Sequence, residues 1–344
     1  MAELTPVTVL TGFLGAGKTT LLNRLLRHPS LARAAVLVNE FGEIGIDHLL
    51  VQKLDDTTVL LNAGCICCSV RGDLVNALRT LLPRARRDDI TRVIIETTGL
   101  ADPLPILATL TGDPVAASAY RLDSIVTVID APNGLENLAH HQEAARQVAI
   151  ADRLIISKPD LADPAPLRAR LRTLNPAAPI RQAADGAIDP AFILGAGLSP
   201  RAPDLAAWLN TPMVAPNVVA PNLDAPDHDH HHHHGAGIDT FSLTFDQPLD
   251  WPGLSLWLQT ITAAHGARLL RLKGILNLRG QDRPMALHVV RHLVHPLQKL
   301  PAWPETDPRT TRLVFITDGL DRRVIEDGLR AFQTAARPEA PSAV

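Results

Sequence analysis

The feature that most restricts the possible folds of this chain is a glycine-rich segment near its start, GFLGAGKT, which runs from Gly12 to Thr19. The segment fits the pattern G-x-x-x-x-G-K-[ST], follows the β-branched run VTVL and precedes the amphipathic stretch TTLLNRLLRH. Glycines let backbone N–H groups wrap a chain of phosphates, and the N-terminus of the following helix supplies positive potential. These residues therefore predict a phosphate-binding loop between a strand and a helix.

The residues of this loop have separate expected roles toward a nucleotide. Lys18 would reach the β- and γ-phosphates and is a predicted catalytic residue, and the Thr19 hydroxyl would bind Mg²⁺. The other nucleotide-binding residues predicted in this segment are Gly12, Gly15, Ala16, Gly17 and Thr20. A glycine-rich turn with a chance lysine is the alternative, and the strand and helix patterns on either side argue against it.

Short β-branched runs alternate with amphipathic stretches from Val7 to about Ile180. Several of the runs are apolar on both faces, a pattern typical of parallel strands that helices cover on both sides. The sequence therefore predicts an α/β fold with a mostly parallel sheet. The expected strands lie at residues 7–10, 34–40, 58–62, 92–96, 124–130 and 153–157, and the clearest helical stretches lie at 19–28 and 73–82.

A change of composition separates this part of the chain from a second one. Pro and Ala accumulate over residues 196–238, where no strand or helix period is sustained, so this segment is expected to be a linker. Strand and helix patterns then return and predict a small α+β domain. The expected organisation is a P-loop domain at 1–195, a Pro/Ala-rich and His-rich linker at 196–238, the α+β domain at 239–335 and a tail at 336–344.

The composition also bounds the class of protein. A formal net charge of −3, with 20% charged and 46% apolar residues, is ordinary for a soluble globular protein and argues against a nucleic-acid binder, which would carry a basic excess. The start of the chain lacks the basic flank and cleavage site of a signal peptide, and no apolar run is long enough to cross a bilayer. We therefore expect a cytoplasmic protein without a nucleic-acid or membrane partner.

A carboxylate at the end of the expected strand at 92–96 is the second part of the predicted nucleotide site. The segment RVIIETTGLADP places Glu96 at the end of that strand and Gly99 three residues later. Glu96, a predicted catalytic residue, would hold the magnesium shell or order the attacking water, and the Gly99 N–H would bond the γ-phosphate. A strand that ends in a surface glutamate is the alternative.

The segment RLIISKPD predicts the residues that read the base. Asp160 follows an expected strand, and a carboxylate that accepts from two adjacent base N–H groups suits guanine and not adenine. Lys158 would lie along the ring, and Ser157 completes the predicted set. A Pro-containing turn with one aspartate is the alternative.

All three cysteines of the chain lie within four positions, at Cys65, Cys67 and Cys68. This spacing is typical of a metal site, because soft sulfur ligands select Zn²⁺, Cu(I) or iron–sulfur chemistry, whereas free cysteines of a core scatter along a chain. Three sulfurs fall one short of a closed tetrahedral site, so one position would stay exchangeable. Three small buried hydrophobes are the alternative.

The residues on either side of the cysteines suggest coupling to the nucleotide. The second expected strand ends in Asn39, Glu40, Gly42 and Glu43, which we expect to form a switch that responds to the γ-phosphate and its Mg²⁺. Metal coordination at the cysteines would then depend on the nucleotide state.

A second metal-like feature lies in the expected linker, where aspartates alternate with imidazoles. Side chains at this density would bind metal ions weakly. An inserted tag and a solvated linker with incidental affinity are the alternatives. The histidines concerned are His228, His230, His231, His232, His233 and His234.

In the order and spelling of its motifs the chain closely resembles the CobW family of metal-handling P-loop GTPases. The motifs are GFLGAGKTT, NEFGEIGID, GCICCSV, ETTGLADP and SKPD, followed by a His-rich linker, RLKGILNLRG and RLVFIT. The resemblance covers essentially the whole chain and implies a GTP-dependent metallochaperone. It would hold Zn²⁺ or Co²⁺ at the three cysteines and pass the ion to a client metalloprotein as GTP is hydrolysed. The guanine motif departs from the family in beginning with Ser157 instead of the common Asn.

Two other functions are compatible with parts of this pattern. A zinc storage or buffer protein would use Cys and His ligands with nucleotide-regulated affinity, and a small-molecule kinase would carry incidental thiols. A kinase should show a basic lid-like segment, which the sequence lacks, and storage should involve several tight ions. The residues do not separate zinc delivery from cobalt delivery for cobalamin synthesis, because ligand preferences overlap. They also leave the client and the oligomeric state open, a homodimer being one option.

Overall fold

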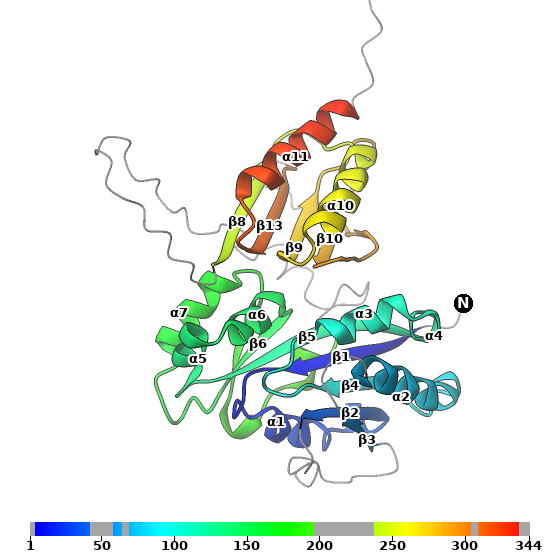
Figure 1. Ribbon diagram of the computed structural model, residues 1–344, viewed down its shortest axis with the longest axis vertical. Coiled ribbons are helices and arrows are strands. Elements are labelled where there is room, and N and C mark those ends of the chain that lie inside the picture. Colours follow the sequence, from blue (N-terminus) through cyan, green and yellow to red (C-terminus); the bar gives the residue numbers. More distant parts are fainter. Residues whose placement is uncertain (1–3, 42–57, 64–68, 196–236, 304–308, 337–344) are drawn as a thin grey trace, which may run out of the picture. The chain divides into compact units, whose positions relative to one another are not determined.

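The computed structural model describes residues 4–41, 58–63, 69–195, 237–303 and 309–336. The chain divides into two compact units, Met1–Ala207 and Trp208–Val344. Because the point of division lies outside the described residues, the domain limits given above stay a prediction. Figure 1 shows both units.

Among the described residues of the first unit, seven strands form one sheet in the order β3-β2-β4-β1-β5-β6-β7, and all the neighbouring pairs are parallel. All five residues of β6 are buried, and successive strand residues point to opposite faces, so both faces of this sheet are covered. The predicted α/β class with a parallel sheet is confirmed. The strands are β1 (Thr5–Thr11), β2 (Ala34–Phe41), β3 (Thr58–Ala63), β4 (Arg92–Glu96), β5 (Tyr120–Asp130), β6 (Arg153–Ser157) and β7 (Ile180–Ala183).

Helix α1 (Lys18–Leu25) shows how this unit is built from its sequence. Its buried residues Leu21, Leu22 and Leu25 recur at helical spacing, and they join a core with Leu10 of β1 and Val128 of β5. Burying a leucine side chain stabilises a fold by about 1.5–3 kcal/mol, so this face fixes the helix that follows the glycine-rich loop. The other helices are α2 (Ser69–Arg86), α3 (Leu104–Gly112), α4 (Pro114–Ala119), α5 (Gly134–His140), α6 (Gln142–Ile150), α7 (Ala165–Leu174) and α8 (Pro190–Ile193).

The order of the strands decides where a ligand can bind. The carboxyl ends of parallel strands share one edge of the sheet, and ligands of such sheets bind at that edge. β1 lies between β4 and β5, and the register pairs Leu10 with Glu96 and Asp130 with Ser157. The glycine-rich loop after β1, the end of β4 and the ends of β5 and β6 therefore meet at one edge.

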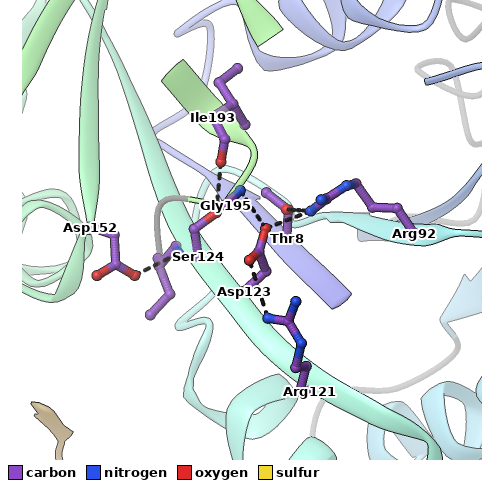
Figure 2. A network of polar contacts seen from close by, with 9 residues as sticks. Thr8, Arg92, Arg121, Asp123, Ser124, Asp152, Ile193 and Gly195 are labelled. Atoms are coloured by element: carbon purple, nitrogen blue, oxygen red, sulfur yellow. Dashed lines mark hydrogen bonds and ion pairs between the residues drawn. The ribbon is translucent and has the colours of Figure 1, made fainter. Parts of the chain in front are cut away.

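A buried ionic network holds the opposite edge of the same sheet (Figure 2). Asp123, near the start of β5, has a fully buried side chain that is ion-paired with Arg92 at the start of β4. The same carboxylate accepts a hydrogen bond of 2.8 Å from the backbone N–H of Gly195, and Ser124 Oγ donates to Ile193 O over 3.0 Å. Ile193 and Gly195, among the last described residues of the unit, are thus hydrogen-bonded to residues near the start of β5, toward the end of the strand opposite its carboxyl edge.

Among the described residues of the second unit, the strands form an antiparallel sheet in the order β11-β10-β9-β13-β8, with β12 paired to β10. Two helices lie side by side against it (Figure 1), and Trp257 of one contacts Phe315 of the sheet edge-on, with 6.2 Å between ring centroids. The predicted small α+β domain is confirmed. Its elements are β8 (Ile238–Phe245), α10 (Trp251–His265), β9 (Leu269–Leu276), β10 (Met285–Val290), β11 (Leu293–Val294), β12 (Gln298–Lys299), β13 (Thr311–Asp318) and α11 (Arg322–Ala335).

None of the helices found in the described ranges combines the length and the apolar character that a membrane crossing would need.

Candidate nucleotide-binding site

All three glycines of the glycine-rich loop have positive φ, a backbone conformation that side chains disfavour. Gly12 has φ 143° and Gly17, directly before α1, has φ 88°, both in the region that side chains disfavour. A Cβ atom at Gly12 would lie 2.1 Å from the carbonyl oxygen of Val128, which is inside van der Waals contact. The loop therefore packs directly on β5, and the motif glycines are explained by the fold itself.

Lys18 is the first residue of α1, and its ammonium group is held within the loop. Nζ donates to the carbonyl oxygens of Gly12, at 2.9 Å, and of Phe13, at 3.2 Å. The residue is 9% exposed, so its charge is largely withdrawn from water at the point where phosphates of a nucleotide would lie. These carbonyl oxygens occupy donors of Nζ that a phosphate could take over.

Thr19 and Glu96 are brought into direct contact. The Thr19 hydroxyl donates to Glu96 Oε1 over 2.7 Å, and Glu96 is only 4% exposed at the end of β4. A hydroxyl oxygen and a carboxylate oxygen are the hard donors that Mg²⁺ takes in nucleotide sites, so the residues present fit this ion. The structure thus places the two residues expected at the ion beside one another.

The loop that follows Glu96 packs against the glycine-rich loop. Thr97 Oγ1 donates to Thr11 Oγ1 over 2.8 Å, and the backbone N–H of Thr97 donates to Leu10 O over 2.9 Å. A Cβ atom at Gly99 would lie 2.5 Å from the backbone nitrogen of Leu14, so only glycine allows this approach. Gly99 therefore lies against the loop that would bind the phosphates.

Two residues of the predicted base motif contact the glycine-rich loop. Ser157 Oγ donates to Ala16 O over 2.6 Å, and Lys158 Nζ donates to Gly15 O over 2.7 Å. The serine that replaces the common asparagine therefore supports the loop from the end of β6. Lys158 adopts φ 50°, a left-handed backbone conformation that residues other than glycine rarely take.

A cavity of about 220 Å³ opens beside these residues, and Asp160 lies on its rim. Apolar side chains form much of its wall, as would suit a flat aromatic base, and Asp160 is an exposed residue of its lining. The glycine-rich loop and α1 close one side of this cavity. The lining residues include Gly17, Thr20, Leu21, Val128, Ile155, Leu161, Ala183, Asp185 and Gly186.

Asp130, at the end of β5, is a carboxylate of this site that was not predicted from the sequence. Asp130 is 1% exposed, accepts from Asn133 Nδ2 over 2.6 Å and lies 3.7 Å from Lys158 Nζ. It therefore helps to hold the lysine that supports Gly15. The signal that could have revealed it is the one used for Glu96, an acidic residue that ends an apolar strand at the same edge.

Several predicted site residues lie outside the described residues, namely Cys65, Cys67, Cys68, Gly42, Glu43, His228, His230, His231, His232, His233 and His234. Asn39 and Glu40 belong to the backbone of β2, where they pair with Leu61 and Asn62 of β3. The described stretch before the cysteines thus ends at Ala63, on the same carboxyl edge as Glu96. Among the described residues there is no group of three or more His, Cys, Asp or Glu side chains suited to a metal ion.

Comparison with known proteins agrees with this geometry. Residues 6–182 match the family model described as CobW/HypB/UreG, nucleotide-binding domain, and residues 238–333 match the cobalamin synthesis protein cobW C-terminal domain. The chain is 33% identical over 313 residues to the zinc chaperone YjiA of Escherichia coli, which covers 90% of this chain and 93% of that protein.

Two further matches extend this comparison. The zinc-regulated GTPase metalloprotein activator 1 of Schizosaccharomyces pombe is 40% identical over 164 residues, or 45% of this chain and 39% of that protein. The crystal structure of Zn(II)-bound YjiA GTPase from E. coli matches with a TM-score of 0.67 and 28% identity over 98% of this chain and 100% of that chain. With matches to both domain models and similarity over nearly its full length, this chain belongs to the CobW/HypB/UreG family.

Proposed function

We propose that this chain is a GTP-dependent zinc metallochaperone, which holds Zn²⁺ at Cys65, Cys67 and Cys68 and transfers it to a client metalloprotein as it hydrolyses GTP. The observation that carries the proposal is the contact of 2.7 Å between the Thr19 hydroxyl and Glu96 Oε1, inside a family of nucleotide-binding proteins. A phosphate-binding loop that already meets a buried carboxylate is arranged for phosphoryl transfer as well as for binding.

The hydrolytic step would use the chain's own charges and donors. Lys18 would exchange its carbonyl partners for the β- and γ-phosphates, and Gly99 would offer its N–H to the γ-phosphate. Bound at Thr19 and Glu96, Mg²⁺ would supply charge that neutralises the phosphate oxygens. Glu96 would in addition orient the attacking water, because its carboxylate is fixed by Thr19 at the end of β4.

Guanine selectivity is assigned to Asp160 at the rim of the cavity. Its carboxylate only accepts hydrogen bonds, and guanine offers two adjacent N–H groups where adenine does not. Ser157 and Lys158 support this role indirectly, because both bond to carbonyl oxygens of the glycine-rich loop and so tie the base pocket to the phosphate site.

Zinc is proposed as the cargo because the relatives' names point to it. The E. coli relative is named a zinc chaperone, the S. pombe relative a zinc-regulated GTPase metalloprotein activator, and the matching crystal structure is Zn(II)-bound. The thiolates of a Cys-x-Cys-Cys segment suit Zn²⁺, and they also suit Co²⁺, which therefore belongs in the test. A reducing compartment such as the cytoplasm would keep these thiols available.

The test is GTP turnover by the full chain, measured with Mg²⁺ and without any phosphate acceptor, before and after one equivalent of Zn²⁺ or of Co²⁺. We expect hydrolysis of GTP that Zn²⁺ changes, and loss of hydrolysis in a Lys18→Ala variant that still folds. Turnover that neither metal changes would favour the storage function. GDP formation that requires a small-molecule acceptor, with the γ-phosphoryl group recovered on that acceptor and not as free phosphate, would favour the kinase.

A further inference from the structure

Gln147 of α6 is a buried amide that no predicted role accounts for. Its side chain is 1% exposed, and Nε2 donates to the carbonyl oxygens of Gly99 and of Ala101, each over 3.1 Å. These two carbonyls belong to the loop after Glu96, almost fifty positions away in the sequence. The contact therefore joins α6 to the loop that would meet the γ-phosphate.

The orientation of the amide follows from the chemistry of its partners. An amide nitrogen carries two hydrogens and an amide oxygen carries none, so only the nitrogen can face two carbonyl oxygens. Gln147 Oε1 is itself buried and has no hydrogen-bond partner among the described residues. A buried polar atom without a partner destabilises the fold, so the unpartnered oxygen does not account for an amide at this position. The two hydrogen bonds that Nε2 donates do account for it.

The backbone of Gln147 is also held in place, by a hydrogen bond from strand β5. The carbonyl oxygen of Gln147 accepts from Thr127 Oγ1 of β5 over 2.7 Å. Since β5 is hydrogen-bonded to β1, the side chain of Gln147 starts from a fixed point of the sheet. Its reach toward the Glu96 loop is thereby set by the sheet that carries the rest of the site.

Gly99 is contacted from two sides, by the glycine-rich loop and by Gln147. Leu14 of the glycine-rich loop lies against its Cα, where a Cβ atom would come within 2.5 Å of the Leu14 nitrogen. Gln147 holds its carbonyl oxygen from the other side. The same nitrogen holds the carbonyl of Ala101, two residues later, so the loop is fixed at two of its peptide groups.

The residue that caps the start of α6 also contacts the glycine-rich loop. His141, the residue that precedes α6, stacks on Phe13 with 4.5 Å between ring centroids and an interplanar angle of 28°. One helix therefore contacts both segments that would bind the phosphates, through His141 at its start and Gln147 in its second turn.

We propose that Gln147 is a positioning residue for GTP hydrolysis, which holds the Gly99 loop so that the Gly99 N–H points at the γ-phosphate. The inference rests on the proposed function and adds a residue to it. Gln147 touches neither nucleotide nor water in this scheme, and it acts through Gly99. A glutamine suits the position because methionine and leucine have no donors and glutamate has only acceptors.

The matched variants are Gln147→Met and Asn175→Leu. Gln147→Met keeps the length of the side chain and removes both donors. Asn175 is a second fully buried amide, whose Nδ2 donates to the carbonyl oxygens of Val148, Ala149 and Ala151 at the end of α6, at 2.8 Å, 3.2 Å and 2.9 Å. Its loss should destabilise the same helix without releasing Gly99.

We expect kcat for GTP to fall roughly 10- to 100-fold in Gln147→Met, since small misplacements of a reacting group cost rates of that order. The affinity for GDP should stay within about twofold, because GDP has no γ-phosphate for Gly99 to meet. The preference for a non-hydrolysable GTP analogue over GDP should also fall, because Gly99 is assigned to the γ-phosphate alone. Asn175→Leu should lower the unfolding temperature and leave kcat, corrected for folded protein, unchanged.

The outcomes separate the two proposals. A wild-type chain that hydrolyses no GTP would contradict the proposed function, and the ratio of analogue to GDP affinity would then still report on Gln147. An active wild type with full kcat and an unchanged affinity ratio in Gln147→Met would overturn the positioning role. Equal loss of kcat in Asn175→Leu would also overturn it, because the effect would then belong to the stability of α6.

Discussion

The Thr19 hydroxyl donates a hydrogen bond of 2.7 Å to Glu96 Oε1, although 77 positions of sequence separate the two residues. The contact exists because β1 and β4 are parallel neighbours that end at the same edge, with Leu10 paired to Glu96. The hydroxyl that donates comes from the first turn of α1 and the carboxylate that accepts comes from the end of β4, so the site depends on the sheet and not on a local motif.

The Glu96→Gln variant tests this pair. It keeps the shape of the side chain and an oxygen that can accept from Thr19, but it removes the negative charge. We expect the rate of GTP hydrolysis to fall by about 10²-fold, the order found when one preorganised group is lost, and the Mg²⁺ concentration for half-maximal rate to rise. Steady-state hydrolysis over a range of Mg²⁺ concentrations measures both.

The control is Thr19→Ser, which keeps the hydroxyl that donates to Glu96. It should retain most of the wild-type rate and Mg²⁺ dependence. If Glu96→Gln hydrolysed GTP with unchanged rate and unchanged Mg²⁺ requirement, the carboxylate would have no part in the reaction.

The Asp160→Asn variant tests base recognition. An amide at this position presents a donor to the N–H groups of guanine, which should weaken GTP binding by roughly 1–3 kcal/mol relative to ATP. Competition between GTP and ATP for the variant and the wild type gives the ratio. Asp163→Asn is a suitable control, because Asp163 Oδ1 accepts from the Ala165 N–H at the start of α7, a bond that an amide oxygen can also accept. An unchanged ratio in Asp160→Asn would remove its base-reading role.

Much of this architecture could be predicted because it follows from local patterns. The runs around Val9, Ile94 and Ile155 are apolar on both faces, which identifies covered parallel strands, and the spacing of Leu21, Leu22 and Leu25 identifies α1. Helix α3 could not be found in this way. Its segment LPILATLTG is apolar nearly throughout and contains Pro105 and Gly112, so it has no polar face to mark a helical period.

The site shows the same division between local and tertiary information. Lys18, Thr19 and Glu96 stand in motifs or at a strand end, so their types and positions were predictable. The bonds from Ser157 to Ala16 and from Gln147 to Gly99 were not, because they depend on how β6 and α6 lie against distant loops. A polar side chain of a helix is expected at the surface, whereas Gln147 is buried and donates to the Gly99 loop.

Tyr120 gives a pH-dependent prediction for the fold. Its hydroxyl donates to Leu78 O of α2 over 2.7 Å, and burial raises the pKa of Tyr120 from 10.0 to about 12. The folded chain therefore keeps a proton that the unfolded chain loses above pH 10.0. The resulting stabilisation is complete below that pH and is lost as the pH rises toward the folded value, so the free energy of unfolding should fall over this window.

This titration can be observed directly, because Tyr120 is the single tyrosine of the chain. The near-ultraviolet absorbance of tyrosinate should rise with a midpoint near pH 12 in the folded protein and near 10.0 in denaturant. Tyr120→Phe should cost about 1 kcal/mol at neutral pH through the lost hydrogen bond, and its stability should fall less steeply in the alkaline window. A folded-state midpoint near that of the denatured chain would show that the hydroxyl is solvated.

The last prediction concerns the coupling between metal and nucleotide. If Cys65, Cys67 and Cys68 form a transferable site, their affinity for Zn²⁺ must differ between the GDP and GTP states, because a ligand shifts an equilibrium only through differential binding. Reciprocity requires Zn²⁺ to change the affinity for GTP by the same factor, and couplings of about 1–3 kcal/mol, or roughly 5- to 150-fold, are usual. Replacing all three cysteines by serine should remove the tight ion and this coupling, while basal nucleotide binding survives, because no thiol is assigned to a phosphate.

The measurement is a titration with Zn²⁺, and in parallel with Co²⁺, against a competing chelator, first with GDP and then with a non-hydrolysable GTP analogue. Deleting residues 228–234 provides the control, since flexible imidazoles lose conformational entropy when they converge on an ion and should bind it weakly. The deletion should lower the number of weak ions and keep both the tight ion and its coupling. Equal Zn²⁺ affinity in the two nucleotide states of the wild type would exclude nucleotide-driven transfer, because hydrolysis would then have no free energy of binding with which to release the metal.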